Sequence, residues 1–544
     1  MSEKKWYLKL LCWVVYIAVF GLLFMVSQPP QKRVPAVDYA NPAVTDVVSL
    51  NDGDITGVLT EDEEVEVYAG IPYAAPPVGE LRWKEPAPVE KWDGTIACDT
   101  FAPMAMQSRG NNIYNALVDI IFRNKWNLHF GKNYNEAVSE DCLYLNVWKP
   151  KGDISDCPVL VYIHGGALTT GQSYYEDNNG ETMARNGIVF VSIAYRLNVF
   201  GYFASEELES ESPNHTTGDY GLLDQIAGLR WVNENIEKFG GNPDNITIAG
   251  ESAGSSSVNA LCVSPLAKGL FKRAIAESSG IVPKVPYHTF RTKEEAIETG
   301  KVTYDEFGAD SIDDLRQIPA EELVNTGVRN DGMMVDGYAI TKQPYLTYEL
   351  GKNNEEALMN GFNADEARVF LITSDKPDAS NYHEFLENVV GEHADEIEKI
   401  LPAGTDEEAK ENFNTFMGVA WFAYSHNVWS EALATQGKPV YEYYFTKTNK
   451  GLGTMHSGEI PYVYGNLYRN PQTYDESDYE LSDSWVSYVV NFCKTGDPNG
   501  TGLPKWERFE NGNVLELGEN TGMIADPFLN IYDVIDKYMD DITK

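Results

Sequence analysis

The sequence predicts an α/β protein built on a large, mostly parallel central sheet that is flanked by helices. Strand-like apolar runs alternate with helical patterns through the first half of the 544 residues, which is typical of parallel sheets covered on both faces. One short strand runs through a Gly-x-Ser-x-Gly turn directly into a helix, an arrangement that presents a side chain at the carboxyl edge of such a sheet. A hydrophobic content of 43% indicates a folded globular chain.

Several short, mostly apolar segments are predicted to be strands. They cover residues 159–163, 188–194, 245–249, 273–276, 357–359 and 440–446. A helix is predicted over residues 222–239, closed by a pair of glycines. Its apolar residues recur at helical spacing: Leu222, Ile226, Leu229 and Val232.

Two acidic, helix-rich blocks interrupt this pattern, from about residue 292 to 340 and from residue 382 to 433. The residues that would complete a site at the sheet edge lie beyond both blocks. We therefore expect helical insertions over the sheet, and not independent domains.

The N-terminus differs in composition from the rest of the chain. An unbroken apolar run covers residues 10–26, and counted from Trp6 it reaches the ~20 residues that span a bilayer. The run ends without the small residues of a cleavage site. We therefore expect a short tail over residues 1–5 and a transmembrane signal anchor over residues 6–27, with a cleaved signal peptide as the alternative.

Residues 28–41 are rich in proline and polar residues, and they are predicted to link this helix to the main domain over residues 42–544. Basic residues before the apolar run slightly outnumber those after it, which favours a membrane-anchored main domain outside the cytoplasm. If the segment is instead a cleaved signal peptide, the protein would be secreted.

The chain is strongly acidic, with a formal net charge of −40 at pH 7. Such a surface repels phosphate backbones, so no nucleic-acid partner is expected. The six cysteines lack the spacing of a metal site, and neither a metal nor another cofactor is expected. Cys98 and Cys142 could form a disulfide bridge, but spacing does not decide cysteine pairing.

The Gly-Glu-Ser-Ala-Gly sequence of residues 250–254 is the most informative turn in the chain. A predicted strand precedes it, and a helix-compatible run over residues 255–261 follows. This combination is the nucleophile elbow, a strained turn that lifts a serine hydroxyl off the sheet edge. Its glycines are needed because side chains there would collide with the neighbouring strand and helix. Ordinary loops also match the pentapeptide, but the flanking elements favour Ser252 as a nucleophile.

A nucleophilic serine needs a base, and in sheets of this kind an acid and then a histidine follow the serine along the chain. His456 follows the predicted strand 440–446 through a glycine-containing loop, so the pattern favours His456. Three histidines precede Ser252, and the others lie in polar, insertion-like or helical sequence: His129, His164, His215, His288, His383, His393 and His426.

The acid that orients the histidine should also follow a strand. Asp365 and Glu366 stand shortly after the predicted strand 357–359. Spacing alone cannot choose between these two adjacent carboxylates.

The tetrahedral intermediate of acyl transfer needs backbone N–H donors. Gly165, Gly166 and Ala167 follow a predicted strand, and their small side chains let a ligand approach the backbone closely. Ala253, the residue after the nucleophile, supplies a further donor. His164 is expected to orient this loop and not to take part in the chemistry.

The sequence resembles the type-B carboxylesterase and cholinesterase-like family of α/β-hydrolases over nearly all of its length from about Val47. The matching blocks are residues 68–74, 79–83, 139–148 and 218–254. The resemblance implies an α/β-hydrolase fold and makes residues 42–544 a type-B carboxylesterase catalytic domain.

The resemblance also assigns roles to individual residues. The family pattern Asn-x-Asp-Glu implies that Glu366 is the orienting acid, and the pattern His-x-x-Glu-hydrophobic supports His456. The oxyanion hole is then formed by the N–H groups of Gly166, Ala167 and Ala253.

Further residues match family positions around this site. Glu251 and Ser278 would lie beside the catalytic groups, as would Gly165 of the glycine-rich loop. The resemblance also implies two structural ion pairs, which join Arg82 to Glu140 and Arg196 to Asp224.

The chain departs from the family pattern at several positions. Leu168 stands where the family usually has an aromatic residue after its glycine-rich loop. Cys142 matches a disulfide cysteine of the family, but the usual partner position falls near Ala105. Residues 107–139 form a longer, aromatic-rich segment, which we interpret either as a lid over the substrate or as core packing.

These observations predict a serine hydrolase that cleaves small-molecule carboxylic esters through an acyl-enzyme intermediate. Ser252 would be the nucleophile, His456 the general base and acid, and Glu366 the orienting acid. One alternative is a non-enzymatic adhesion or scaffold protein on the same fold, and another is a thioester or lipid hydrolase at the membrane. The complete set of catalytic residues favours an enzyme.

Overall fold

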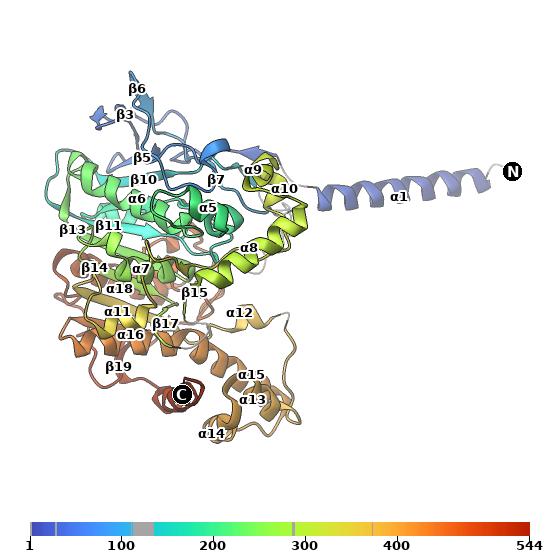
Figure 1. Cartoon of the computed structure of the whole chain (residues 1–544), viewed down its shortest axis with the longest axis vertical. Helices are drawn as coiled ribbons and strands as arrows, with labels where there is room; N and C mark the ends of the chain where they lie inside the picture. The colour runs from blue at the N-terminus through green and yellow to red at the C-terminus, as the bar shows by residue number, and fades with distance from the viewer. Residues whose placement is uncertain are drawn as a thin grey trace.

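A computed structural model describes residues 3–27, 30–109, 111, 135–284, 289–372 and 374–543, without the side chains of residues 3–8 and 24–26. Within these residues, the centre of the molecule is an 11-stranded sheet (Figure 1). In spatial order its strands are β20 (Gly522–Ala525), β19 (Asn513–Leu517), β18 (Val440–Phe445), β17 (Ala357–Asn363), β14 (Arg273–Glu277), β13 (Gly241–Glu251), β11 (Cys157–Ile163), β12 (Val189–Ile193), β10 (Tyr144–Pro150), β5 (Val65–Pro72) and β4 (Val58–Leu59).

The strands from β12 to β19 are parallel to one another, and the strands at both edges of the sheet are antiparallel to their neighbours. The predicted strands all belong to the parallel part. The mostly parallel sheet expected from the sequence is therefore confirmed, with antiparallel additions at its edges.

Short strands lie outside this sheet: β1 (Gln31–Lys32), β2 (Val48–Ser49), β3 (Asp54–Thr56), β6 (Thr95–Ala97), β7 (Met104–Ala105), β8 (Asn135–Glu136), β9 (Val138–Ser139), β15 (Arg291–Thr292) and β16 (Met334–Val335). The longer helices are α1 (Glu3–Val26), α6 (Tyr220–Asn235), α7 (Ala253–Val263), α8 (Lys293–Phe307), α13 (Tyr382–Val390), α15 (Asp406–Gly418), α16 (Tyr424–Thr435), α18 (Glu476–Thr495) and α19 (Leu529–Ile542).

The described residues also form shorter helices: α3 (Glu181–Arg185), α4 (Asn198–Tyr202), α5 (Glu206–Glu211), α9 (Ile312–Gln317), α10 (Ala320–Leu323), α11 (Pro344–Glu349), α12 (Arg368–Leu371), α14 (Ala394–Ile400) and α17 (Ile460–Val463). Helical turns are η1 (Gly79–Leu81), η2 (Ile236–Phe239), η3 (Pro265–Ala267), η5 (Gly391–His393), η6 (Val419–Ala423) and η7 (Leu467–Arg469).

Helices cover both faces of the sheet. Along β11, successive side chains belong alternately to two hydrophobic cores, one on each face. Val161 and Ile163 belong to one core, which also contains residues of α6, α7 and α16. Leu160 and Tyr162 belong to a second core, which contains residues of α3 and α18. Because successive side chains of a strand point to opposite faces, a strand that is apolar throughout is buried on both sides.

The two acidic blocks form helices that extend the sheet domain. The first contains α8 to α10, and the second contains α13 to α16. Helices α13 to α15 share a third core with α19 near the C-terminus (Figure 1). The helices predicted in these two blocks are therefore present.

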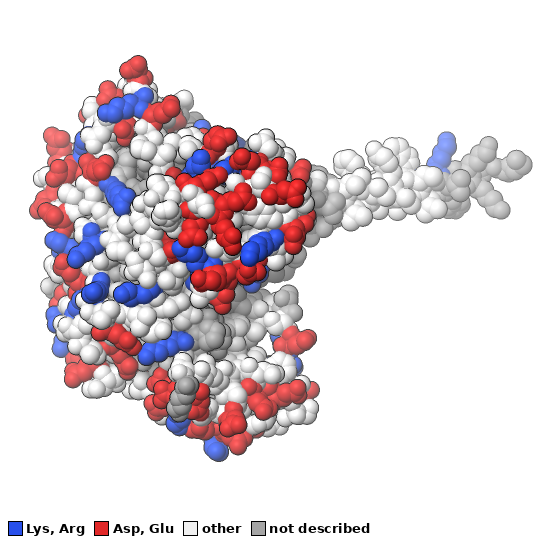
Figure 2. All heavy atoms as spheres, in the orientation of Figure 1, with Lys and Arg blue, Asp and Glu red and all other residues white. Residues whose placement is uncertain are grey.

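Acidic side chains gather on the face that carries α5, α8, α9 and α10 (Figure 2). The first turns of these helices supply Glu206, Glu207, Glu209, Glu294, Glu295, Asp313, Asp314, Glu321 and Glu322. Carboxylates near helix N-termini interact favourably with the helix dipole, which makes this charge compatible with the fold.

The N-terminal helix α1 projects away from the rest of the chain (Figure 1). Among the described residues, no helix combines the length and the apolarity that crossing a bilayer requires. The transmembrane anchor predicted over residues 6–27 is therefore not supported. A cleaved signal peptide, and a location outside the cytoplasm, stay predictions.

Part of the segment predicted as a linker is attached to the main domain. The backbone N–H of Ala36 donates to the carbonyl of Asp99, and the N–H of Phe101 donates to the carbonyl of Val34. Tyr39 Oη donates to the carbonyl of Leu59 at 2.6 Å. Residues 34–39 thus pack against the sheet domain, and the domain limits stay a prediction.

Two further sequence predictions concern cysteines and the aromatic-rich segment. Cys98 and Cys142 are both buried, and neither is part of a disulfide, so the bridge considered between them is wrong. A buried thiol behaves as a small apolar side chain, and both belong to one core. Most of residues 107–139 lies outside the described residues, so the choice between a lid and core packing is not tested.

Candidate active site

Ser252 stands in a strained turn between β13 and α7. Its backbone angles are φ 56° and ψ −126°, a conformation that L-residues rarely adopt and that costs about 1–3 kcal/mol. The Ser252 N–H donates to the carbonyl of Glu277 on β14 at 2.9 Å, which ties the turn to the next strand. The geometry is that of a nucleophile elbow.

Three glycines let the elbow form. A Cβ on Gly250 would lie 2.5 Å from the backbone of Gly254, and a Cβ on Gly254 would lie 2.1 Å from the carbonyl oxygen of Ile163. A Cβ on Gly165 would lie 2.6 Å from the carbonyl oxygen of Glu251. The turn, strand β11 and helix α7 are therefore packed too closely for any side chain at these positions.

Glu366 and His456 meet at the carboxyl edge of the same sheet. Glu366 follows the end of β17, and His456 lies in the loop after β18, the neighbouring parallel strand. His456 Nδ1 and Glu366 Oε2 are hydrogen bonded at 2.7 Å, and both side chains are buried. The backbone N–H of Asn363 donates to Glu366 Oε1 at 2.7 Å, which fixes the carboxylate.

Asp365 faces different partners from those of Glu366. Its carboxylate accepts hydrogen bonds from Arg368 and Asn414. Of the two adjacent carboxylates, Glu366 is the one that lies against the imidazole of His456.

The second ring nitrogen of His456 faces a residue that sequence reasoning placed only nearby. Nε2 lies 3.2 Å from Glu251 Oε1, the side chain immediately before Ser252. Within the described residues Nε2 has no hydrogen-bond partner, so no bond joins it to the hydroxyl of Ser252. The expected chain of hydrogen bonds from acid to base to serine is therefore formed only between Glu366 and His456.

The imidazole lies among three buried carboxyl groups. Burial opposes protonation of His456, yet the carboxylates of Glu251, Glu366 and Glu459 outweigh this and raise its pKa to about 9. Burial, together with the Glu251 and Glu366 carboxylates, raises the pKa of Glu459 to about 8. Burial also raises the pKa of Glu251. The charge states of His456, Glu251 and Glu459 therefore depend on one another.

Hydroxyl groups hold the outer members of this cluster. Ser278 Oγ donates to Glu459 Oε1 at 2.8 Å, and Ser457 Oγ donates to Glu251 Oε1 at 2.6 Å. The amide of Asn363 also donates to Glu459. Ser278 thus contacts Glu459, and Glu251 lies beside His456. The contact of Ser457 was not predicted, although it follows His456 directly.

Aromatic side chains pack against the imidazole from the outer side. The rings of Phe370 and Phe422 lie 5.0 and 4.9 Å from that of His456, and they stack on each other at 5.8 Å. Phe422 belongs to η6, a single π-helical turn of the kind often found at functional sites. The sequence offered an aromatic run here, but its contact with His456 depends on the fold.

The glycine-rich loop after β11 has an unusual backbone conformation. Gly166, Ala167 and Leu168 all have positive φ, at 107°, 54° and 58°. Within the part of the chain that is described, the N–H groups of Gly166, Ala167 and Ala253 donate to no other group. They are available to a ligand oxygen.

His164 supports this loop as predicted. Its ring stacks on Tyr195 at 4.5 Å, and its Nδ1 lies 2.9 Å from the carbonyl oxygen of Gly165. Burial lowers the pKa of His164 to about 4, so the ring is neutral near neutral pH.

Both ion pairs implied by the resemblance are present. Arg82 binds Glu140 through two hydrogen bonds of 2.6 Å. Arg196 binds Asp224 through two hydrogen bonds of 2.8 Å, and both are buried. Among the described residues, His383, Asp395 and Glu398 bring three potential metal ligands within 4.8 Å at the exposed surface, outside the candidate active site.

Comparison with known proteins identifies the class. The carboxylesterase family model matches residues 44–532. Fumonisin B1 esterase of Sphingopyxis macrogoltabida is 33% identical over 501 residues, which cover 86% of each chain. Carboxylesterase 1C of Rattus norvegicus is 31% identical over 527 residues, which cover 89% of this chain and 91% of the relative. The crystal structure of Geobacillus stearothermophilus carboxylesterase EST55 has a TM-score of 0.76 and 31% identity, and the match covers 90% of this chain and 100% of that chain.

The chain therefore belongs to the carboxylesterase family, and its fold is that of the α/β-hydrolase esterases. It is a carboxylic ester hydrolase, as the sequence predicted. The alternative of a non-enzymatic scaffold on the same fold is not supported.

Proposed function

We propose that the protein hydrolyses small-molecule carboxylic esters through a covalent acyl-enzyme formed on Ser252. The observation that carries the proposal is the hydrogen bond between His456 and Glu366 at the same sheet edge as the strained turn of Ser252. Segments that are far apart in the sequence supply these groups.

In the first half of the reaction, Ser252 Oγ bonds to the ester carbonyl carbon while its proton passes to His456 Nε2. The proton then passes to the leaving alkoxide as the carbon–oxygen bond breaks. Glu366 keeps Nδ1 protonated, holds the ring in place and stabilises the imidazolium without taking its proton. In the second half, water attacks the acyl-enzyme by the same route and releases the carboxylic acid.

The negative charge on the carbonyl oxygen needs donors that are already in place. The N–H groups of Gly166, Ala167 and Ala253 are proposed to bind this oxygen. Their lack of other acceptors among the described residues supports this role.

The reaction requires the Ser252 hydroxyl to approach His456 Nε2 more closely than it does in this structure. Catalytic hydrogen bonds of unliganded enzymes often shorten only in the substrate complex. A crystal structure of the phosphonylated enzyme, in which phosphorus is bonded to Ser252 Oγ, is expected to show Nε2 facing that oxygen.

Covalent labelling tests the proposal directly. A fluorophosphonate should form one phosphorus–oxygen bond with Ser252 and release fluoride, and peptide mass spectrometry should locate the label. Ser252→Ala should abolish labelling and lower kcat for an aryl acetate by about 10⁴-fold or more. Ser256→Ala is the matched control, because Ser256 lies on the next turn of α7 and its hydroxyl contacts Ser279. Labelling that persists in Ser252→Ala, or is lost in Ser256→Ala, would contradict the proposal.

A further inference from the structure

Ser457 has a backbone conformation that its residue type seldom adopts. Its φ is 67°, in the left-handed region that favours glycine. A serine stays in this region only where the surrounding structure fixes the turn, and such residues cluster at functional sites. Ser457 directly follows His456, so the turn lies within the candidate active site.

The turn directs the Ser457 hydroxyl at the carboxylate of Glu251. Ser457 Oγ donates to Glu251 Oε1 at 2.6 Å, and the same oxygen lies 3.2 Å from Nε2 of His456. An ionised carboxylate oxygen can accept hydrogen bonds from a hydroxyl and from an imidazolium together, because it has two lone pairs. One oxygen of Glu251 is thus shared between two consecutive residues of the loop after β18.

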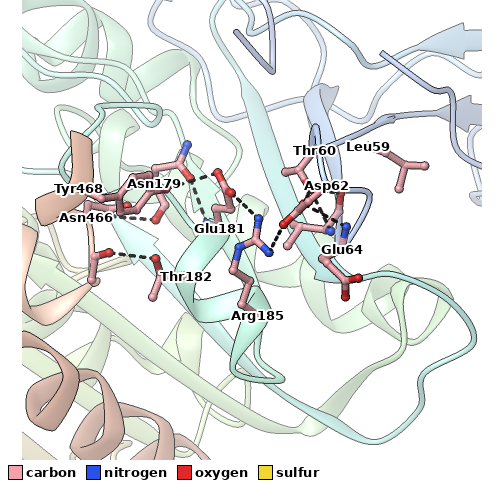
Figure 3. Close-up of polar contacts among 12 residues, drawn as sticks. Leu59, Thr60, Asp62, Glu64, Asn179, Glu181, Thr182, Arg185, Asn466 and Tyr468 are labelled. Atoms are coloured by element: carbon pink, nitrogen blue, oxygen red, sulfur yellow. Dashed lines mark hydrogen bonds and ion pairs between the residues drawn. The ribbon is translucent and has the colours of Figure 1, made fainter. Parts of the chain in front are cut away.

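The segment that follows Ser457 is held from outside the site. Thr182 Oγ1 donates to the carbonyl of Gly465 at 2.9 Å, and the amide of Asn466 donates to the carbonyl of Asn179 at 3.0 Å (Figure 3). These contacts restrain the chain on the far side of α17. They help to keep the turn at Ser457 in its unfavourable conformation.

Glu251 lies among ionisable side chains that come from several strands of the sheet and from the segments after them. They are Tyr162 of β11, Glu277 of β14, Glu366 after β17, Tyr443 of β18, and His456 and Glu459 after β18. Burial raises the pKa of Glu277 and of both tyrosines well above their usual values, which favours their neutral forms.

The hydrogen bond from Ser457 affects the charge of Glu251. Burial raises the pKa of Glu251, whereas His456 and the Ser457 hydroxyl both lower it. A donor that binds a carboxylate stabilises the ionised form. The Ser457 hydroxyl therefore favours a negative charge beside the imidazole.

We propose that Ser457 is a positioning residue of the ester hydrolysis, whose hydroxyl holds the ionised Glu251 carboxylate beside Nε2 of His456. The inference rests on the proposed acyl transfer to Ser252. When Nε2 takes the serine proton, the imidazolium gains a positive charge that this carboxylate stabilises. Because the charge arises only with proton transfer, the stabilisation acts on kcat and not on substrate binding.

The pH–rate profile of Ser457→Ala tests the proposal. Without the hydroxyl, Glu251 is protonated more readily and the imidazolium is less favoured, so the rising limb should move to lower pH by about 0.5 unit or more. On the plateau above the limb, kcat should fall about threefold or more, while KM stays the same. A profile that superposes on that of the parent protein would overturn the proposal.

A double-mutant cycle with Glu251→Gln separates this role from a merely structural one. The carboxylate is absent in that background, so adding Ser457→Ala should leave the limb where Glu251→Gln alone places it. Equal shifts in both backgrounds would mean that Ser457 acts without Glu251, and the proposal would be wrong.

Two further variants control for the strained backbone and for the loss of a hydroxyl as such. Ser457→Gly also removes the hydroxyl but accepts the positive φ, so it should move the limb as far as Ser457→Ala does, and it decides if Ser457→Ala does not fold. Ser380→Ala removes a hydroxyl that donates to Asp378 at 2.6 Å on the surface, and it should leave the profile unchanged. A shift in Ser380→Ala, or none in Ser457→Gly, would contradict the proposal.

Fluorophosphonate labelling distinguishes failure of this inference from failure of the proposed function. The parent protein and the Ser457 variants should all be labelled at Ser252, whose hydroxyl is unchanged. A parent protein that is not labelled there rejects the proposed function, and with it the role of Ser457. A labelled Ser252 with an unmoved limb in the Ser457 variants rejects only the role of Ser457.

Discussion

His456 and Glu366 stand 90 positions apart in the chain and are joined by a hydrogen bond of 2.7 Å between Nδ1 and Oε2. Asp365, the neighbour of Glu366, instead accepts hydrogen bonds from Arg368 and Asn414. The two carboxylates, which spacing alone could not separate, thus have different hydrogen-bond partners, and they form a matched pair for mutagenesis.

Glu366→Gln should lower kcat for an aryl ester by on the order of 10³–10⁴-fold, because the neutral amide no longer stabilises the imidazolium or favours its reactive tautomer. Asp365→Asn should retain nearly full kcat, since Asp365 does not contact His456. Steady-state kinetics with one ester, on variants of equal melting temperature, checks this. A large loss of kcat in Asp365→Asn alone would reverse the assignment.

Glu251→Gln should move the rising limb of the pH–rate profile to lower pH. The base must be neutral to act, so activity rises as pH passes upward through the pKa of His456, which neighbouring carboxylates raise to about 9 against the opposing effect of burial. Removing the Glu251 carboxylate removes one of these charges and lowers that pKa. The measurement is kcat/KM from about pH 5 to about pH 10.

Glu349→Gln is the control for this shift, since Glu349 is an exposed residue that pairs with Lys284. Its profile should superpose on that of the parent protein. An unmoved limb in Glu251→Gln would mean that Glu251 does not set the charge state of the imidazole.

Gly254→Ala should disturb the elbow. The added methyl group would lie 2.1 Å from the carbonyl oxygen of Ile163, so β11 and α7 must move apart. We expect a loss of about 1–3 kcal/mol in stability and about 10²-fold in kcat/KM. Gly522→Ala, where the same group meets nothing within 4 Å, should be close to neutral in urea denaturation and in ester hydrolysis.

Asp224→Asn should destabilise the fold by about 3–5 kcal/mol, because it leaves the buried Arg196 guanidinium without its counter-ion. Asp313→Asn should change stability by less than about 0.5 kcal/mol, since Asp313 is 79% exposed and its partner Arg316 also binds Glu211. The measurement is the urea concentration at the midpoint of unfolding for each of the two variants and for the parent protein. Equal midpoints would show that burial does not determine how much these ion pairs contribute to the free energy of unfolding.

The sheet could be predicted because its central strands are buried on both faces, so that each is a short apolar run that ends in a turn. The segment over residues 159–163 and the elbow strand are examples, and both lie within observed strands. The antiparallel edge strands are less distinct, because edge positions tolerate mixed composition. The contacts of residues 34–39 with the sheet domain also could not be read from their proline-rich sequence.

Ser252 and His456 could be chosen as candidates because the serine, the acid and the histidine must follow one another in this order along the chain. This order excludes the histidines that precede Ser252. Side-chain direction was not predictable. Spacing does not reveal that Glu251 faces His456 Nε2, nor that Phe370 and Phe422 reach the imidazole from separate helices.

The strands β13, β17 and β18 follow one another along the chain, so the ribosome synthesises Ser252 first, then Glu366 and then His456. The serine is synthesised long before the imidazole, and the loop that carries His456 emerges only after most of the chain has been translated. An unfinished polypeptide therefore lacks the proposed base, so we expect ester hydrolysis to begin only after residue 456 has been synthesised. A chain arrested before residue 456 would contain the strained turn of Ser252 but no imidazole that could activate its hydroxyl.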